Sequence, residues 1–218
     1  MKRELRLTRG EYWLLETVVE ARIPLCWLDW PSMEEALNKQ GHGLDRSRLL
    51  RTLYRLFRSG LIEAHRFHDP EDYFIPSRQE ISAALDETQS PGQNPMYYGL
   101  TGEGGAAWEA FAAPTWQRFI DLSFQPLEAS TTEIGQGICA DRGRLERYVD
   151  GLSYTGITID SSTMVWDELI PWQATYWKTL PRGYQVTFHC QRSEEPSSWD
   201  RMPLSYYLVY ENRWYSWR

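Results

Sequence analysis

The spacing of apolar residues changes near the middle of the chain, and this change restricts the fold more than any other feature. Up to about residue 112, apolar residues recur every three or four positions, which predicts amphipathic helices. Beyond that point most segments are short and rich in aromatic and β-branched residues, as strands are. Pro114 follows this transition and cannot continue a helix, because it has no N–H to donate. The sequence therefore predicts an α+β protein with one domain at residues 1–112 and another at residues 113–218.

The composition of the 218 residues excludes several classes of protein. With 42% hydrophobic and 24% charged residues, the chain is able to bury a core, which excludes a disordered protein. No run of 18 apolar residues is present, so we expect no membrane segment. The first residues lack the apolar run of a secretory signal, which predicts a cytoplasmic location. Cys26, Cys139 and Cys190 are odd in number and far apart, which favours isolated reduced thiols.

Helix-capping patterns in the sequence predict where helices of the first half begin. Thr8 and Glu11 form a capping box that predicts the start of a first helix. Ser32 and Glu35 repeat the pattern and predict a short helix that ends near Lys39. The further elements predicted in this half are a helix at 44–60, a strand at 61–67, a helix at about 77–85, a strand at 96–101 and a helix at 102–112.

The helix predicted at residues 44–60 has two chemically different faces. Projected at 100° per residue, its leucines and Phe57 fall on one side and predict a core stripe. The opposite side holds Ser47, Arg48, Arg51, Tyr54, Arg55 and Arg58. No acidic residue lies on that side of the helix. Residues 44–66 carry a net charge of +4, although residues 1–112 carry −4.

Two motifs in the first half resemble those of winged-helix regulators of the PadR/MarR type. They are Arg58-Ser-Gly-Leu-Ile62, where the third helix meets the wing, and Tyr97-Tyr-Gly-Leu-Thr-Gly-Glu-Gly104, where the last wing strand ends. The resemblance covers residues 8–112 and implies a helix-turn-helix with a two-stranded wing. It implies that Arg48, Arg51 and Arg55 contact DNA, with Ser47, Tyr54 and Arg58 in support. In this sequence 28 residues separate the wing strands and include a predicted helix, so the wing is enlarged.

Two functions are consistent with this charge pattern. Arginine pairs bidentately with phosphate and with guanine, so the basic face favours a DNA-binding transcriptional regulator. The C-terminal domain would then sense a signal or dimerise, and a homodimer is one expected assembly. Asp69, Glu71 and Asp72 at the wing entrance would repel a phosphate, which opposes DNA binding. The net charge of −7 and the helix in the wing favour a different function. This alternative is a protein-interaction module, such as an adaptor, an antitoxin-like protein or an immunity-type protein, that binds a protein partner through a winged-helix scaffold.

The second half predicts a mostly antiparallel α+β domain. Residues 115–122 continue as a short helix, and Asp141 begins a second helix that ends at Gly151. The predicted strands are 130–140, 156–160, 163–170, 172–179, 184–191, 204–211 and 213–217.

Aromatic residues are concentrated in the second half, where they make up 18 of 106 residues. Because aromatic side chains are favoured in strands and cover large areas, they could serve as ordinary core. Tryptophan and tyrosine are also enriched where a surface binds a partner. The residues that we assign to such a partner or ligand surface are Trp172, Trp177, Trp214 and Trp217.

The chain contains none of the usual sequence motifs for nucleotide binding, serine hydrolysis or zinc proteolysis. His65, His68 and Asp69 are close in sequence, but residues three apart on a strand point to opposite faces, which opposes a metal site. Gly102-Glu-Gly-Gly105 precedes a helix, and we interpret it as a site of tight helix packing. We therefore expect no enzymatic activity, no metal and no cofactor.

Overall fold

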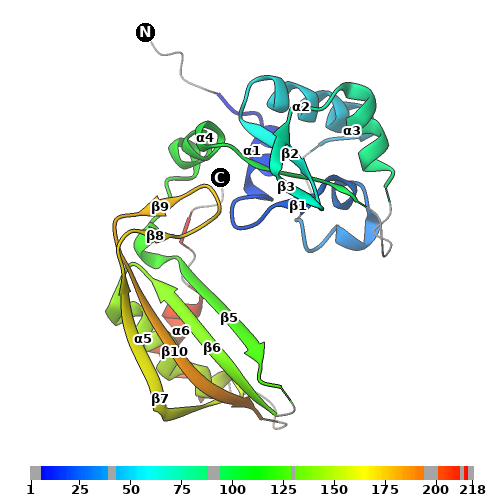
Figure 1. Cartoon of the computed structure of the whole chain (residues 1–218). Helices are drawn as coiled ribbons and strands as arrows, with labels where there is room; N and C mark the ends of the chain where they lie inside the picture. Colours follow the sequence, from blue (N-terminus) through cyan, green and yellow to red (C-terminus); the bar gives the residue numbers. More distant parts are fainter. Residues whose placement is uncertain are drawn as a thin grey trace. The chain divides into compact units, whose positions relative to one another are not determined.

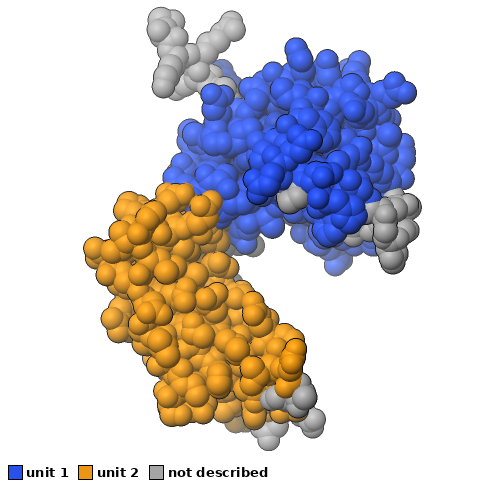
Figure 2. Space-filling model, viewed as in Figure 1, with its two compact units in different colours: residues 1–112, 175–178 blue, residues 113–174, 179–218 orange. Residues whose placement is uncertain are grey.

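The structure is a computed structural model that describes residues 6–38, 43–87, 94–128, 131–193, 201–211 and 214–215. It combines helices with antiparallel sheets, which confirms the predicted α+β class. The chain forms two compact units (Figure 2). The first comprises residues 1–112 together with 175–178, and the second comprises residues 113–174 and 179–218. Four residues from late in the sequence thus pack into the first unit.

The first two α-helices of the first unit begin after residues whose side chains cap them (Figure 1). In α1 (Arg9–Glu16), the Thr8 hydroxyl accepts from the backbone N–H of Glu11 at 3.3 Å, and the Glu11 carboxylate accepts from the backbone N–H of Thr8 at 2.8 Å. In α2 (Arg46–Arg58), the Asp45 carboxylate accepts from the backbone N–H of Arg48 at 2.8 Å. Just beyond the C-terminus of α2, Gly60 adopts a φ of +74°, which favours glycine.

The other helices of this unit are α3 (Arg78–Leu85), which starts with the predicted Ser77–Glu80 capping box, and α4 (Gly102–Ala112). The prediction of a helix after Ser32 is wrong. A 3-10 turn, η2 (Pro31–Met33), occupies this position after η1 (Leu25–Leu28). Ser32 lies inside the 3-10 turn instead of preceding a helix, so it caps nothing.

Among the described residues, the sheet of the first unit has the strand order β1-β4-β2-β3, with antiparallel neighbours. The strands are β1 (Ile23–Pro24), β2 (Ile62–Arg66), β3 (Asp69–Phe74) and β4 (Met96–Leu100). Sequence reasoning missed β3, because a proline and three acids made this segment resemble a loop. It lies at the edge of the sheet, where such residues are tolerated.

The apolar stripe of α2 is confirmed, because Leu49, Leu53, Leu56 and Phe57 are all buried. They belong to the core of the first unit together with Trp108 of α4, which is completely buried. The glycines before Trp108 allow this packing. A side chain at Gly104 would collide with the carbonyl oxygen of Leu61, so the predicted tight helix packing is also confirmed.

The sheet of the second unit has the order β5-β6-β10-β7 among the described residues, again with antiparallel neighbours. These strands are β5 (Ile120–Pro126), β6 (Thr132–Cys139), β7 (Ile157–Leu169) and β10 (Gly183–Arg192). Two short strands, β8 (Trp172–Gln173) and β9 (Thr179–Leu180), form a separate hairpin. The helical elements are η3 (Trp116–Arg118), α5 (Arg142–Gly151), η4 (Leu152–Thr155) and α6 (Leu204–Glu211).

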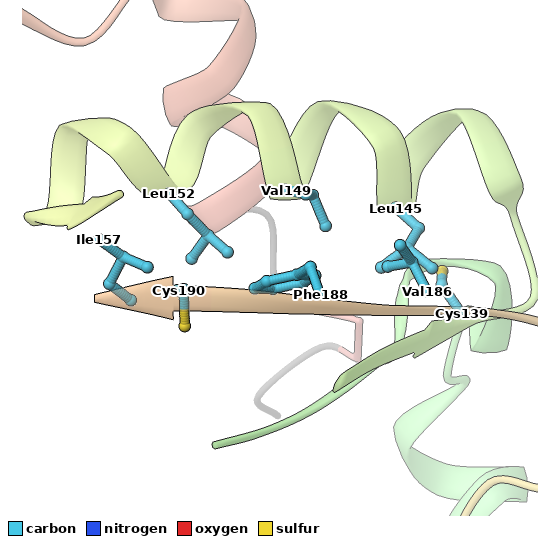
Figure 3. Packing of buried hydrophobic residues seen from close by; sticks show 8 residues of the cluster. All are labelled: Cys139, Leu145, Val149, Leu152, Ile157, Val186, Phe188 and Cys190. Carbon is cyan, nitrogen blue, oxygen red and sulfur yellow. The ribbon is translucent and has the colours of Figure 1, made fainter. Parts of the chain in front are cut away.

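The core of the second unit lies between α5 and β10 (Figure 3). Leu145 and Val149 point from the helix toward Val186 and Phe188 on the strand. Gly135 lies opposite Phe188 on β6, and a Cβ atom there would collide with the phenyl ring. The absence of a side chain at Gly135 therefore leaves room for the Phe188 ring to pack between β6 and helix α5.

Several predictions in the second half are wrong. The strand predicted at 204–211 is helix α6, because Val209 packs inward and the buried Arg144 guanidinium donates to its carbonyl oxygen at 2.8 Å.

The helix predicted at 115–122 is η3 followed by β5. The predicted strands 156–160 and 163–170 are the single strand β7, with an irregularity after Asp160. The strand predicted at 172–179 is interrupted by the turn 175–178. Most of the strand predicted at 213–217 lies outside the described residues.

Candidate nucleic-acid interface

The outer face of α2 is accessible to solvent. Its exposed residues are Ser47, Arg48, Arg51, Arg55 and Arg58, and Tyr54 is half-buried beside them. The Arg78 guanidinium of α3 lies 6.0 Å from the centre of the Tyr54 ring, close enough for a cation–π contact. The structure therefore brings together on one face all six residues that the sequence assigned to DNA contact.

The guanidinium groups of this face are exposed, and Arg48, Arg51 and Arg55 contact other described residues. Arg48 lies 3.5 Å from the Asp45 carboxylate and donates to the carbonyl oxygen of Gly43 at 3.2 Å. Arg51 donates to the carbonyl oxygen of Ser47 at 3.3 Å, and Arg55 lies 2.9 Å from the Glu11 carboxylate. The Arg48–Asp45 pair is exposed on both sides, and such pairs contribute about 0–1 kcal/mol, so Arg48 is easily recruited by another anion. The Glu11 carboxylate that Arg55 contacts is only 13% exposed.

Two other arginines of the basic segment have structural roles. Arg46 contacts the carboxylates of Asp29 at 2.5 Å and Asp86 at 2.9 Å, which links α2 to the end of α3. Arg66 contacts the Glu87 carboxylate at 2.9 Å. The net charge of +4 in residues 44–66 therefore overstates the charge available for binding, because these two guanidinium groups already have carboxylate partners.

A hollow of about 380 Å³ lies beside the N-terminal end of α1. It is lined by Thr8, Leu44, Arg48, Arg51, Thr52 and Arg55. Gly10 of α1 permits this arrangement, because a Cβ atom there would lie 2.7 Å from the Leu44 side chain. Three of the six candidate residues thus share one concave site. Sequence reasoning missed the contribution of Thr8, whose capping box gave no indication that α1 lies beside the basic face.

The hairpin formed by β2 and β3 has the opposite character. Asp69, Glu71 and Asp72 are exposed on it, and the Phe67 side chain at its turn is 54% exposed. Carboxylates at this position repel phosphate. The hairpin therefore provides no basic surface to extend the α2 face.

The predicted tryptophan surface is not formed by Trp172, whose side chain is only 2% exposed. Its ring stacks on Phe119 with the ring centres 6.1 Å apart, and Gly183 packs against it. Trp214 is half-buried with its ring centre 4.7 Å from that of Trp116. For Trp172 the prediction is wrong, because burial against other rings removes it from any surface. Trp217 lies outside the described residues.

Trp177 belongs to the hairpin tip, the residues 175–178 that pack in the first unit. Its indole N–H donates to the carbonyl oxygen of Val19 at 2.8 Å, and its ring occupies the space that a side chain at Gly105 would need. The Tyr176 hydroxyl donates to the carbonyl oxygen of Val18 at 2.6 Å and accepts from the backbone N–H of Leu100 at 2.5 Å. These bonds satisfy buried backbone groups, so the hairpin tip completes the first unit.

Burial shifts the pKa values of two described groups in opposite directions. Burial raises the pKa of the Cys139 thiol, which keeps it protonated at neutral pH. Burial also lowers the pKa of His65, whose ring lies against Tyr97. Within the described part of the chain, no group of three potential ligands is placed to hold a metal ion. None of the described helices is long and apolar enough to span a bilayer.

Comparisons with known proteins give no assignment for this chain. No protein-family model matches it, and neither the curated proteins nor the solved structures include a match.

Proposed function

We propose that the first unit is a winged helix that binds duplex DNA through the outer face of α2. One observation carries the proposal: Arg48, Arg51 and Arg55 are exposed on one helix face and line one hollow. Arg58, Ser47 and Tyr54 extend this face along the helix. The strand order β1-β4-β2, with α2 directly before β2, supports the winged-helix assignment. In this assignment β3 and α3 are the enlargement of the wing.

The chemistry of arginine suits this role. A single α-helix fits the major groove of B-form DNA, and guanidinium groups form paired hydrogen bonds with guanine or phosphate. Each phosphate contact also releases a counterion, which favours association at low salt. The exposed ion pair of Arg48 costs little to exchange for a contact with DNA.

We assign a regulatory role to the whole chain, with the second unit as a sensing or dimerisation domain. In α6, Leu204 and Leu208 are 69% and 53% exposed and lie one helical turn apart. Exposed large apolar residues at this spacing favour contact with another protein surface, including a second copy of this chain.

A second candidate function is protein binding by the same scaffold without DNA. The exposed acids and Phe67 of the β2–β3 hairpin favour it, because carboxylates and an exposed aromatic ring suit a basic protein partner better than a phosphate backbone. This function requires that the α2 face contributes nothing to duplex binding.

Fluorescence anisotropy with a labelled duplex of about 20 base pairs tests the proposal. The triple variant R48A/R51A/R55A should lose at least about 100-fold in affinity at 50 mM salt, since single contacts contribute about 1–3 kcal/mol each. The matched control R142A/R182A/R192A removes three exposed, ion-paired arginines from the second unit and gives the same net charge. An equal loss in both variants, or no loss in the first, would contradict the proposal.

A further inference from the structure

We infer that the hollow beside α1 is a seat for a single phosphate group, and that Glu11 limits its affinity. This inference deepens the proposed function and rests on it for the role of the arginines. The hollow is lined by the Arg48, Arg51 and Arg55 side chains, and by the hydroxyl-bearing residues Thr8 and Thr52. Its volume of about 380 Å³ lies in the range of small-molecule sites, so it has room for a phosphate with part of the group that carries it.

The charges around the hollow favour an anion. Three guanidinium groups line it, and two carboxylates balance part of their charge: Asp45 contacts Arg48 and Glu11 contacts Arg55. The guanidinium of Arg51 donates only to a backbone carbonyl oxygen within the described residues. The net charge at the hollow is therefore positive, and Arg51 is the group best placed to pair with an incoming anion.

The contacts of the Glu11 carboxylate identify the hydrogen-bond donors that a phosphate could use at this site. Its carboxylate accepts from the Thr8 hydroxyl at 2.7 Å and from the Thr8 backbone N–H at 2.8 Å, and it lies 2.9 Å from the Arg55 guanidinium. A hydroxyl, a backbone N–H at a helix N-terminus and an arginine are the donors that phosphate oxygens use in proteins. The protein's own carboxylate thus engages part of the donor set and adds a negative charge beside the seat.

Two sources could supply the phosphate. In duplex DNA it would be a backbone phosphate, held in the hollow while other α2 residues contact the groove. Otherwise it would be the phosphate of a free phosphorylated small molecule. Both sources share the same chemistry, so the experiment uses inorganic phosphate and a duplex as separate probes.

Isothermal titration calorimetry with inorganic phosphate, at constant ionic strength adjusted with chloride, tests the seat in the full-length protein. We expect one phosphate per chain. Glu11→Gln should tighten phosphate binding about 3- to 10-fold, because removal of a nearby like charge favours the anion. This variant should keep its fold, because glutamine is also accepted at this position of a capping box. Arg51→Gln should weaken phosphate binding at least about 5-fold, since it removes a charge-assisted hydrogen bond. The control Arg182→Gln, in the second unit, should leave phosphate binding unchanged.

The outcomes separate this inference from the proposed function. If phosphate fails to bind the wild-type protein, or binds equally to Glu11→Gln and wild type, the seat is refuted, whereas duplex binding that depends on the arginines still supports the proposed function. If phosphate binds and responds to both variants but the duplex does not bind, the seat is supported with a small molecule as its source, and the proposed function fails. If both bind and phosphate competes with the duplex, the backbone phosphate is the source.

Discussion

The outer face of α2 and the hairpin tip at residues 175–178 carry similar signals in the sequence but have different positions in the structure. Each concentrates one kind of side chain, arginine in the first and aromatic residues in the second. The sequence assigned six residues of the α2 face, and Trp177 of the tip, to a binding surface. In the structure the arginines remain exposed, whereas Trp177 and Tyr176 pack within the first unit. A cluster of one residue type therefore predicts an exposed binding surface only when burial of that residue type is energetically costly.

The energetics explain this difference. Burial of an unpaired guanidinium group is strongly unfavourable, so arginines on a face without acids stay in solvent. An aromatic ring gains free energy when it leaves water, and the N–H or O–H group on its edge can bond to a buried carbonyl. Trp177 and Tyr176 satisfy both conditions through the carbonyl oxygens of Val19 and Val18. Aromatic content alone thus indicates internal packing as readily as it indicates a partner site.

The largest expected effect comes from the α2 face. The triple variant R48A/R51A/R55A should lose at least about 100-fold in duplex affinity. Its free energy of unfolding should fall by less than about 2 kcal/mol, since the Arg48–Asp45 pair is exposed and Glu11 keeps its two bonds to Thr8 when Arg55 is removed. Urea denaturation followed by circular dichroism measures the second quantity. A large loss of stability would mean that these arginines hold the fold together, and the comparison with the hairpin tip would fail.

The opposite pattern is expected for the hairpin tip. Trp177→Ala should lower the free energy of unfolding of the first unit by about 2–4 kcal/mol, because it leaves a cavity against Gly105 and removes the bond to Val19. Trp177→Phe keeps part of the packing and should lose less. Duplex affinity, measured where both variants are folded, should stay within about twofold of wild type. If Trp177→Ala has the same free energy of unfolding as wild type, the hairpin tip does not stabilise the first unit.

A smaller effect is expected from the acids of the β2–β3 hairpin. D69N/E71Q/D72N should raise duplex affinity about 2- to 5-fold at 50 mM salt, because it removes negative charge from the unit that we propose binds DNA, a polyanion. The gain should shrink at 200 mM salt, as screening increases. Affinity that falls in this variant would show that the hairpin contacts DNA directly, and the role assigned to its acids would be wrong.

The smallest effect concerns the pH dependence of stability. Burial lowers the pKa of His65 in the folded state, so the unfolded chain binds the proton more readily. The contribution of His65 to stability is therefore complete above pH 6.5 and decreases as the pH falls below it. Denaturation at pH 7.5 and pH 5.0 should show a larger loss in wild type than in His65→Gln. Equal losses would show that His65 titrates alike in both states.

Local signals predicted much of the fold, and non-local contacts account for most of the errors. The α2 helix was predictable because its two faces and the glycine that ends it, Gly60, lie within one segment of sequence. The role of Trp177 was not, since its partner Val19 lies 158 residues away. Helix α6 was mistaken for a strand because its aromatic and β-branched residues favour strands, whereas its position is fixed by Arg144. The hollow required α1 and α2 side by side, and no single segment contains that information.

The salt dependence of duplex binding tests the central claim most directly. If Arg48, Arg51 and Arg55 each neutralise a phosphate, each contributes about −0.9 to the slope of log association constant against log salt concentration. Anisotropy titrations between 50 and 200 mM salt should therefore give a slope that is less steep by about 2 to 3 in R48A/R51A/R55A than in wild type. Equal slopes in the two proteins, or no duplex binding by wild type at 50 mM salt, would contradict the assignment of the α2 face to DNA.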